Sequence, residues 1–214
     1  ARSGTTVESV VQEMFMVAKE DKMRLLDKLL VEYKGTVLVF SRTKHGAKKM
    51  AMAIRRMGHS SAEIHSNRSL AQRKEALGGF KSGKYRVLVA TDIAARGIDV
   101  TGIELVINYD LPDVAEDYVH RIGRTGRAGM AGRAISFATP DQKGDIRQIE
   151  RLVRTQFSLL KPTELPAHRA PDPNAKPDRP ERSQRGPRQY GRPGGGKPVY
   201  QGSRPSHGPA PRSS

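Results

Sequence analysis

Three features that the sequence lacks limit the classes of protein to which it could belong, before any motif is considered. The 214 residues include no cysteine, which excludes disulfide bonds, thiolate metal sites and cysteine nucleophiles. Hydrophobic residues make up 36% of the chain, below the ~45–50% of an average globular domain, and no apolar run approaches the ~20 residues that span a bilayer. The first residues, Ala1–Gly4, include neither a start Met nor an apolar segment. We therefore expect a fragment of a cytoplasmic protein that has no membrane partner.

Basic residues outnumber acidic ones, and the composition divides the chain in two. The formal net charge is +16, from 38 Lys and Arg against 22 Asp and Glu. Residues 161–214 hold 12 of the 14 prolines and few large apolar side chains. Such a segment buries too little apolar surface to offset the entropy of ordering it. We predict one folded domain over 1–160 and a disordered, basic tail rich in Arg, Gly and Pro over 161–214.

Short apolar runs alternate with helical patterns along the first 160 residues. Four runs are typical of strands buried on both faces of a sheet, namely 37–40, 87–90, 105–107 and 134–137. Apolar residues spaced by three and four predict helices over about 23–30, 47–57, 69–81, 113–122 and 142–156. Asp113 is the expected N-cap of the fourth helix. This alternation predicts an α/β fold, a parallel sheet with helices on both faces, in which ligands bind at the carboxyl ends of the strands.

The segment after the 87–90 strand combines residues suited to binding a nucleotide. Thr91 and Asp92 stand where a helix N-terminus would offer free N–H groups to a phosphate. Gly97 permits close backbone approach, and the carboxylate of Asp99 is able to accept hydrogen bonds from a ribose. Read alone, the same pattern fits a helix cap followed by a C-terminal glycine equally well.

The segment from His120 to Arg127 concentrates arginines among glycines. His120, Arg124 and Arg127 are spaced i, i+4 and i+7, which would place them on one face of a continuing helix. Arginine makes planar, permanently charged contacts with phosphate, and a transferring γ-phosphoryl group needs such a donor. The alternative is a solvated basic turn without a ligand.

Two further candidates are weaker when taken alone. Ser41, Arg42 and Thr43 end a buried strand, where hydroxyls and a base are able to hold a nucleic-acid backbone, although strand ends are commonly polar. Arg73 lies on a helix whose charged outer face is its simplest explanation. Two stretches, 78–84 and 191–197, have the spacing of a Walker A loop, but neither joins a strand to a helix. Asp92 and Asp110 alone stand where a Walker B-type metal ligand would, and no metal site is assigned.

Taken together and in this order, the segments resemble the C-terminal RecA-like domain of a bacterial DEAD-box ATP-dependent RNA helicase. Residues 90–99 match the family's motif V, residues 120–127 match motif VI, and residues 39–43 resemble motif IV. The resemblance covers about residues 1–158. Two positions depart from the family pattern: Leu70 stands where glutamine is frequent, and Ser66 where glycine is frequent.

The resemblance implies a role for each candidate. Arg124 and Arg127 would be catalytic arginine fingers, and Gly97 and Asp99 would join them in binding ATP. His120 would couple the nucleotide site to the interdomain interface. The residues implied in RNA-backbone binding are Ser41, Arg42, Thr43, Arg73, Thr91 and Gly97.

The resemblance also implies that half of a composite site is missing. ATP with Mg²⁺ would be bound mainly by the absent N-terminal RecA-like domain, so the fragment alone is not expected to hydrolyse ATP. The expected partners are that domain and RNA, to which the Arg-rich tail would add sequence-tolerant contacts. Two alternatives stay open: a non-enzymatic RNA-binding or adaptor module, and half of a DNA-acting superfamily 2 helicase.

Overall fold

A parallel sheet forms the centre of the computed structural model, which describes residues 10–95, 100, 103–126 and 132–167. Its strands are ordered β3-β4-β2-β5-β6-β1-β7, and every pairing between them is parallel. Their bounds are β1 Val10–Met16, β2 Val37–Phe40, β3 Ser61–Ile64, β4 Val87–Ala90, β5 Leu105–Asn108, β6 Gly132–Ala138 and β7 Leu159–Leu160. The expected α/β fold with a parallel sheet is confirmed.

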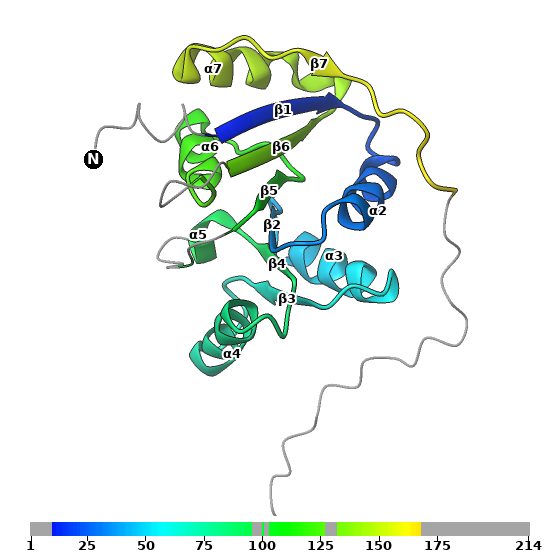
Figure 1. Ribbon diagram of the computed structural model, residues 1–214. Coiled ribbons are helices and arrows are strands. Elements are labelled where there is room, and N and C mark those ends of the chain that lie inside the picture. The colour runs from blue at the N-terminus through cyan, green and yellow to red at the C-terminus, as the bar shows by residue number, and fades with distance from the viewer. Residues whose placement is uncertain (1–9, 96–99, 101–102, 127–131, 168–214) are drawn as a thin grey trace, which may run out of the picture. The chain divides into compact units, whose positions relative to one another are not determined.

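Helices cover both faces of this sheet (Figure 1). Helices α2 (Lys22–Glu32) and α3 (Lys44–Arg56) pack on one face, where their apolar residues join those of β2, β4 and β5 in one core. The other face carries α4 (Leu70–Lys81), α5 (Asp92–Ala95), α6 (Ala115–Ile122) and α7 (Lys143–Val153). A short 3₁₀ turn, Pro140–Gln142, precedes α7. In the described part of the chain, no helix has the length and apolar character needed to cross a membrane.

The start of α6 and the end of α7 are among the helix boundaries that differ from those expected. Helix α6 begins at Ala115 with Val114 as its N-cap, so the expected cap at Asp113 is wrong; the Asp113 carboxylate instead pairs with Arg42 at 3.3 Å. Helix α7 ends at Val153 rather than near 156, because Arg154 adopts a left-handed backbone conformation with φ 54°, which cannot continue a right-handed helix.

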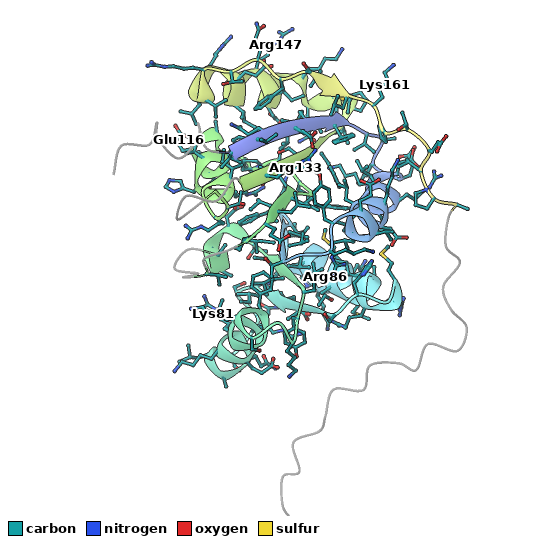
Figure 2. All side chains as sticks on the ribbon, in the orientation of Figure 1. Lys81, Arg86, Glu116, Arg133, Arg147 and Lys161 are labelled. Atoms are coloured by element: carbon teal, nitrogen blue, oxygen red, sulfur yellow. The ribbon has the colours of Figure 1, made fainter. Side chains whose placement is uncertain are left out.

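Ordered packing continues past residue 160 along α2. Arg24 donates to the carbonyl oxygens of Pro166 (2.7 Å) and Leu165 (3.2 Å), and Lys28 donates to that of Thr163 (2.6 Å). The side chain of Leu165 packs against the α2–α3 core. At the opposite end of α2, Arg86 donates to the carbonyls of Leu30 and Tyr33 (Figure 2). Residues 161–167 therefore belong to the folded part, and the rest of the expected tail lies outside the described residues.

Candidate functional site

The carboxyl ends of three neighbouring strands bring the predicted segments together. In the sheet register, Phe40 of β2 lies opposite Ala90 of β4 and Asn108 of β5. The chain leaves these strands at one edge, so the loops that follow them, together with α5 and the C-terminal half of α6, surround one area.

Arg121 lies at the centre of this area and is 2% exposed. Its guanidinium forms a two-pronged ion pair with Asp92 at 2.6 and 2.7 Å. It also donates to the side chain of Asn108 (3.3 Å) and the carbonyl of Asp110 (2.6 Å), and lies 4.9 Å from the centre of the Phe40 ring. A buried charge with all these partners is satisfied. Arg121 therefore joins β2, α5 and the β5–α6 loop to α6.

Arg124, three residues later, lies in a different environment. Its side chain is half-buried, and its Nε donates to the backbone carbonyl of His120 at 3.3 Å. His120 is exposed on α6, which ends at Ile122, before Arg124. Both residues border a small pocket of about 40 Å³, whose other lining residues are Phe40, Asp92, Ala95, Asp117 and Arg121. Arg124 therefore lies at the surface of this area, whereas Arg121 is buried beneath it.

Three predicted nucleotide-site residues, Gly97, Asp99 and Arg127, lie outside the described residues. Gly126 and Gly132 lie on either side of the segment that contains Arg127. They approach so closely that a Cβ on Gly132 would lie 2.2 Å from the Gly126 nitrogen, which only glycine tolerates.

The three residues after β2 form a turn into α3. Ser41 is 1% exposed, so its hydroxyl lies beneath the surface, whereas Arg42 and Thr43 are exposed. Thr43 is the N-cap of α3, because its Oγ1 accepts from the Gly46 N–H at 3.0 Å. Its hydroxyl proton is thereby directed away from that amide, beside the positive end of the helix dipole. Arg42 and Thr43 are able to contact a phosphate from this position.

Arg73 and Thr91 lie on neighbouring elements. Arg73 of α4 donates to the carbonyl of Ala94 in α5 at 3.4 Å. Thr91 follows β4, and its carbonyl accepts from the amides of Ala94 and Ala95. Ser69 begins α4 with a reciprocal capping pair to Gln72. The backbone of α5 is therefore held from both β4 and α4.

The two aspartates considered as metal ligands are engaged by cations. Asp92 binds Arg121, and Asp110 binds Lys22. Among the described residues, no group of histidine and acidic side chains could hold a metal ion. Sequence reasoning missed Lys22, which is 5% exposed and 88 residues from Asp110. No local pattern marks such a pair.

Comparison with known proteins decides the family. A family model described as the helicase conserved C-terminal domain matches residues 21–129, just over half of the chain. The chain is 40% identical over 161 residues to the DEAD-box ATP-dependent RNA helicase CshA of Geobacillus kaustophilus, covering 75% of this chain and 34% of the relative. It is 40% identical over 183 residues to the ATP-dependent RNA helicase DbpA of Bacillus subtilis, covering 84% of this chain and 38% of that one. The chain belongs to the DEAD-box helicases, as a C-terminal domain.

Solved DEAD-box structures share the fold of this helicase domain. A DEAD box protein from Methanococcus jannaschii superposes with a TM-score of 0.68 at 39% identity, covering 72% of this chain and 42% of that one. The DEAD-box protein SrmB of E. coli, solved bound to regulator of ribonuclease activity A, superposes with a TM-score of 0.65 at 31% identity, covering 75% and 96%. The fold is therefore RecA-like, as expected. The chain spans about a third of the curated relatives named above.

Proposed function

We propose that this domain completes an ATPase site whose other half lies on an N-terminal RecA-like domain, and that it holds RNA at the same edge of the sheet. The observation that carries the proposal is the different placement of two neighbouring arginines. Arg121 is buried and pairs with Asp92, whereas the half-buried Arg124 lines the surface pocket beside exposed His120. Arg124, with Arg127, would stabilise charge on the transferring phosphoryl group.

The size of the pocket supports a half-site. A volume of about 40 Å³ has room for a few water molecules, whereas ligand pockets measure roughly 300 Å³ or more. A larger hollow of about 540 Å³ lies between α2 and residues 164–167, but Asp27, Glu32 and Glu164 line it and would repel a triphosphate. The nucleotide and its Mg²⁺ would therefore be held mainly by the N-terminal domain.

The exposed groups at the strand ends suit a sugar-phosphate backbone. Arg42 and Thr43 stand at the N-terminus of α3, and Arg73 stands where α4 meets α5. Cationic and hydroxyl contacts of this kind position a strand without reading its bases. Binding of RNA and ATP would close the two domains over the strand and locally separate a duplex, and hydrolysis would reopen them.

The decisive experiment replaces Arg124 in the complete enzyme. Arg124→Ala should lower RNA-stimulated ATP turnover on the order of 10³-fold if the residue acts as an arginine finger. Arg147→Ala is the matched control, since Arg147 is an exposed arginine on α7 (Figure 2), and should leave turnover unchanged. Clear ATP hydrolysis by the 1–214 chain alone would refute the half-site.

The same preparations separate the two alternatives. An adaptor module would keep its cellular function when Arg124 and Arg127 are both replaced. A DNA-acting enzyme would show equal competition by DNA and RNA strands for binding and for stimulation of ATPase activity. We expect RNA, and not DNA, to stimulate ATP turnover.

A further inference from the structure

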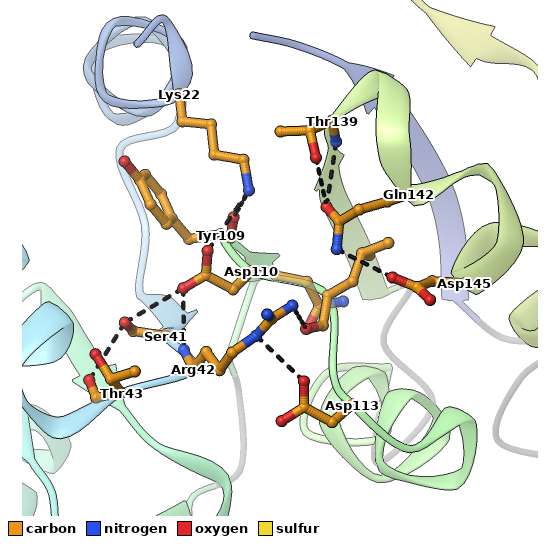
Figure 3. A network of polar contacts seen from close by, with 12 residues as sticks. Lys22, Ser41, Arg42, Thr43, Tyr109, Asp110, Asp113, Thr139, Gln142 and Asp145 are labelled. Carbon is orange, nitrogen blue, oxygen red and sulfur yellow. Dashed lines mark hydrogen bonds and ion pairs between the residues drawn. The ribbon is translucent and has the colours of Figure 1, made fainter. Parts of the chain in front are cut away.

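A buried lysine from α2 reaches the strand ends of the proposed RNA site (Figure 3). Lys22 is the first residue of α2, and its Nζ donates to the carbonyl of Tyr109 at 2.9 Å and to Oδ1 of Asp110 at 3.5 Å. Burial lowers the pKa of the ammonium from its ordinary value of 10.5, and the Asp110 carboxylate opposes that shift. The lysine is therefore a desolvated cation whose charge is compensated mainly by one carboxylate, that of Asp110.

The second oxygen of that carboxylate faces the loop after β2. Oδ2 of Asp110 accepts from the backbone N–H of Arg42 at 3.0 Å and lies 3.5 Å from the hydroxyl of Ser41. The Ser41 hydroxyl also lies 3.5 Å from the carbonyl oxygen of Thr43. One carboxylate therefore links a cation on α2 to the backbone of the turn that presents Arg42 and Thr43.

Packing alone does not require a charge at this place. Burying an ion pair costs desolvation that its attraction roughly offsets, so an apolar side chain would serve stability as well. The ammonium orients the Asp110 carboxylate, because it holds Oδ1 and so turns Oδ2 toward the Arg42 amide. With its side chain only 6% exposed, Lys22 is too enclosed to bind a phosphate itself.

We propose that Lys22 is a positioning residue for RNA binding, acting through Asp110 on the turn Ser41–Thr43. The inference rests on the proposed contact between that turn and RNA. Without the ammonium, the carboxylate rotates, the Arg42 amide loses its acceptor, and Arg42 and Thr43 sample more conformations. RNA binding then has to order them first, which weakens affinity.

The test measures binding of a fluorescein-labelled ten-nucleotide oligouridine to the 1–214 chain by fluorescence anisotropy at fixed salt. Lys22→Met should weaken binding by about threefold to tenfold, the range expected when one hydrogen-bonded link is lost. Hydrogen exchange of the Arg42 amide, followed by NMR, should accelerate in the same variant, whereas amides in α7 should keep their rates.

Two controls separate positioning from charge and from stability. Lys28→Met also replaces a lysine of α2 by methionine, but Lys28 donates to the carbonyl of Thr163 and not to the turn. Ile149→Val trims a buried residue of α7 on the other face of the sheet and lowers stability without touching the turn. Both should bind oligouridine within about twofold of the parent chain, since neither touches the turn.

Further variants keep the inference testable if Lys22→Met folds poorly. Lys22→Arg retains a cation and should restore most of the affinity, and Asp110→Asn should accelerate exchange at Arg42 and weaken binding in the same direction as Lys22→Met. Unchanged oligouridine affinity and unchanged Arg42 exchange in folded Lys22→Met or Asp110→Asn would overturn the inference. If Arg42→Ala and Thr43→Ala also bind normally, the proposed RNA contact itself is wrong; if they bind weakly, only the role of Lys22 fails.

Discussion

Arg121 donates two hydrogen bonds to the carboxylate of Asp92, at 2.6 and 2.7 Å, across 29 residues of sequence. The pair fixes α6 against α5, and Arg124, in the turn that follows α6, lies half-buried beside the surface pocket. One motif thus contains a structural arginine and a candidate catalytic one. Arg121 lies on α6, whereas Arg124 lies in the turn after the helix ends at Ile122, so the two side chains lie at different depths.

Replacing these two arginines should therefore change the free energy of unfolding by different amounts. Arg121→Met leaves Asp92 without its cation in a largely buried site and should lower the free energy of unfolding by roughly 3–5 kcal/mol. Arg124→Met, at the surface, should change it by less than about 1 kcal/mol. Urea unfolding of the 1–214 chain measures both values, and equal losses in the two variants would contradict the assignment.

Much of the sheet follows from sequence because its central strands are uniformly apolar. The runs 37–40, 87–90 and 105–108 have no polar residue before the Asn108 position, and all lie between two layers of helices. The sequence patterns do not predict strands β1, β3 and β7. Strand β3 is missed because its sequence Ser61–Ile64 alternates polar and apolar residues, yet all are buried. Glu63 is tolerated there because Arg55 and Arg68 both pair with it.

The candidate site residues, like the strands, can be predicted only where a local sequence pattern marks them. Arg124, Arg42 and Thr43 could be named as candidates because each belongs to a contiguous motif. Lys22 could not, because its significance depends on Asp110, and only the fold brings these two residues together. Arg121 could be seen as part of a basic cluster, but the carboxylate that neutralises it lies in another segment. Long-range pairing of charges is the information that a local pattern lacks.

Removing an acidic neighbour of Arg42 should strengthen RNA binding. Asp113 is 72% exposed in its side chain and pairs with the Arg42 guanidinium at 3.3 Å, so it competes with a phosphate for that group. Asp113→Asn should tighten oligouridine binding by about twofold to fivefold at low salt, and the gain should fade at high salt as the charges are screened. Anisotropy titrations at several salt concentrations measure this, with Glu116→Gln as the control, since Glu116 is an exposed residue of α6. Equal gains in both variants would indicate a nonspecific effect of net charge.

Adjacent glycines in α4 should respond oppositely to alanine. A Cβ on Gly78 would meet no atom within 4 Å, whereas one on Gly79 would lie 2.5 Å from the Tyr85 ring. Gly78→Ala should raise the free energy of unfolding by about 0.5–1 kcal/mol, because alanine restricts the unfolded chain and favours helix. Gly79→Ala should lower it, since the ring must move. Urea unfolding tests the pair, and stabilisation by both substitutions would show that Tyr85 yields without cost.

Burial of His65 should make the domain less stable in mild acid. This residue, 4% exposed at the end of β3, accepts from the Asn67 amide through Nδ1 at 3.3 Å, and its Nε2 has no hydrogen-bond partner among the described residues. Burial lowers the pKa of the imidazole below 6.5; Arg68, Lys48 and His45 act in the same direction, and Glu63 opposes them.

The sign of the effect follows from proton binding in the two states. Between the lowered folded pKa of His65 and 6.5, the unfolded chain binds more protons than the folded one. Stability therefore falls as pH drops through this window, by at most about 1.4 kcal/mol per pH unit. Urea unfolding between about pH 7.5 and 5.5, one unit either side of 6.5, should show a smaller slope in His65→Gln than in the parent chain. The exposed His120, which is not among the groups that shift the pKa of His65, supplies the control: His120→Gln should keep the parental slope, and a parental slope in His65→Gln would mean that other groups set the acid sensitivity.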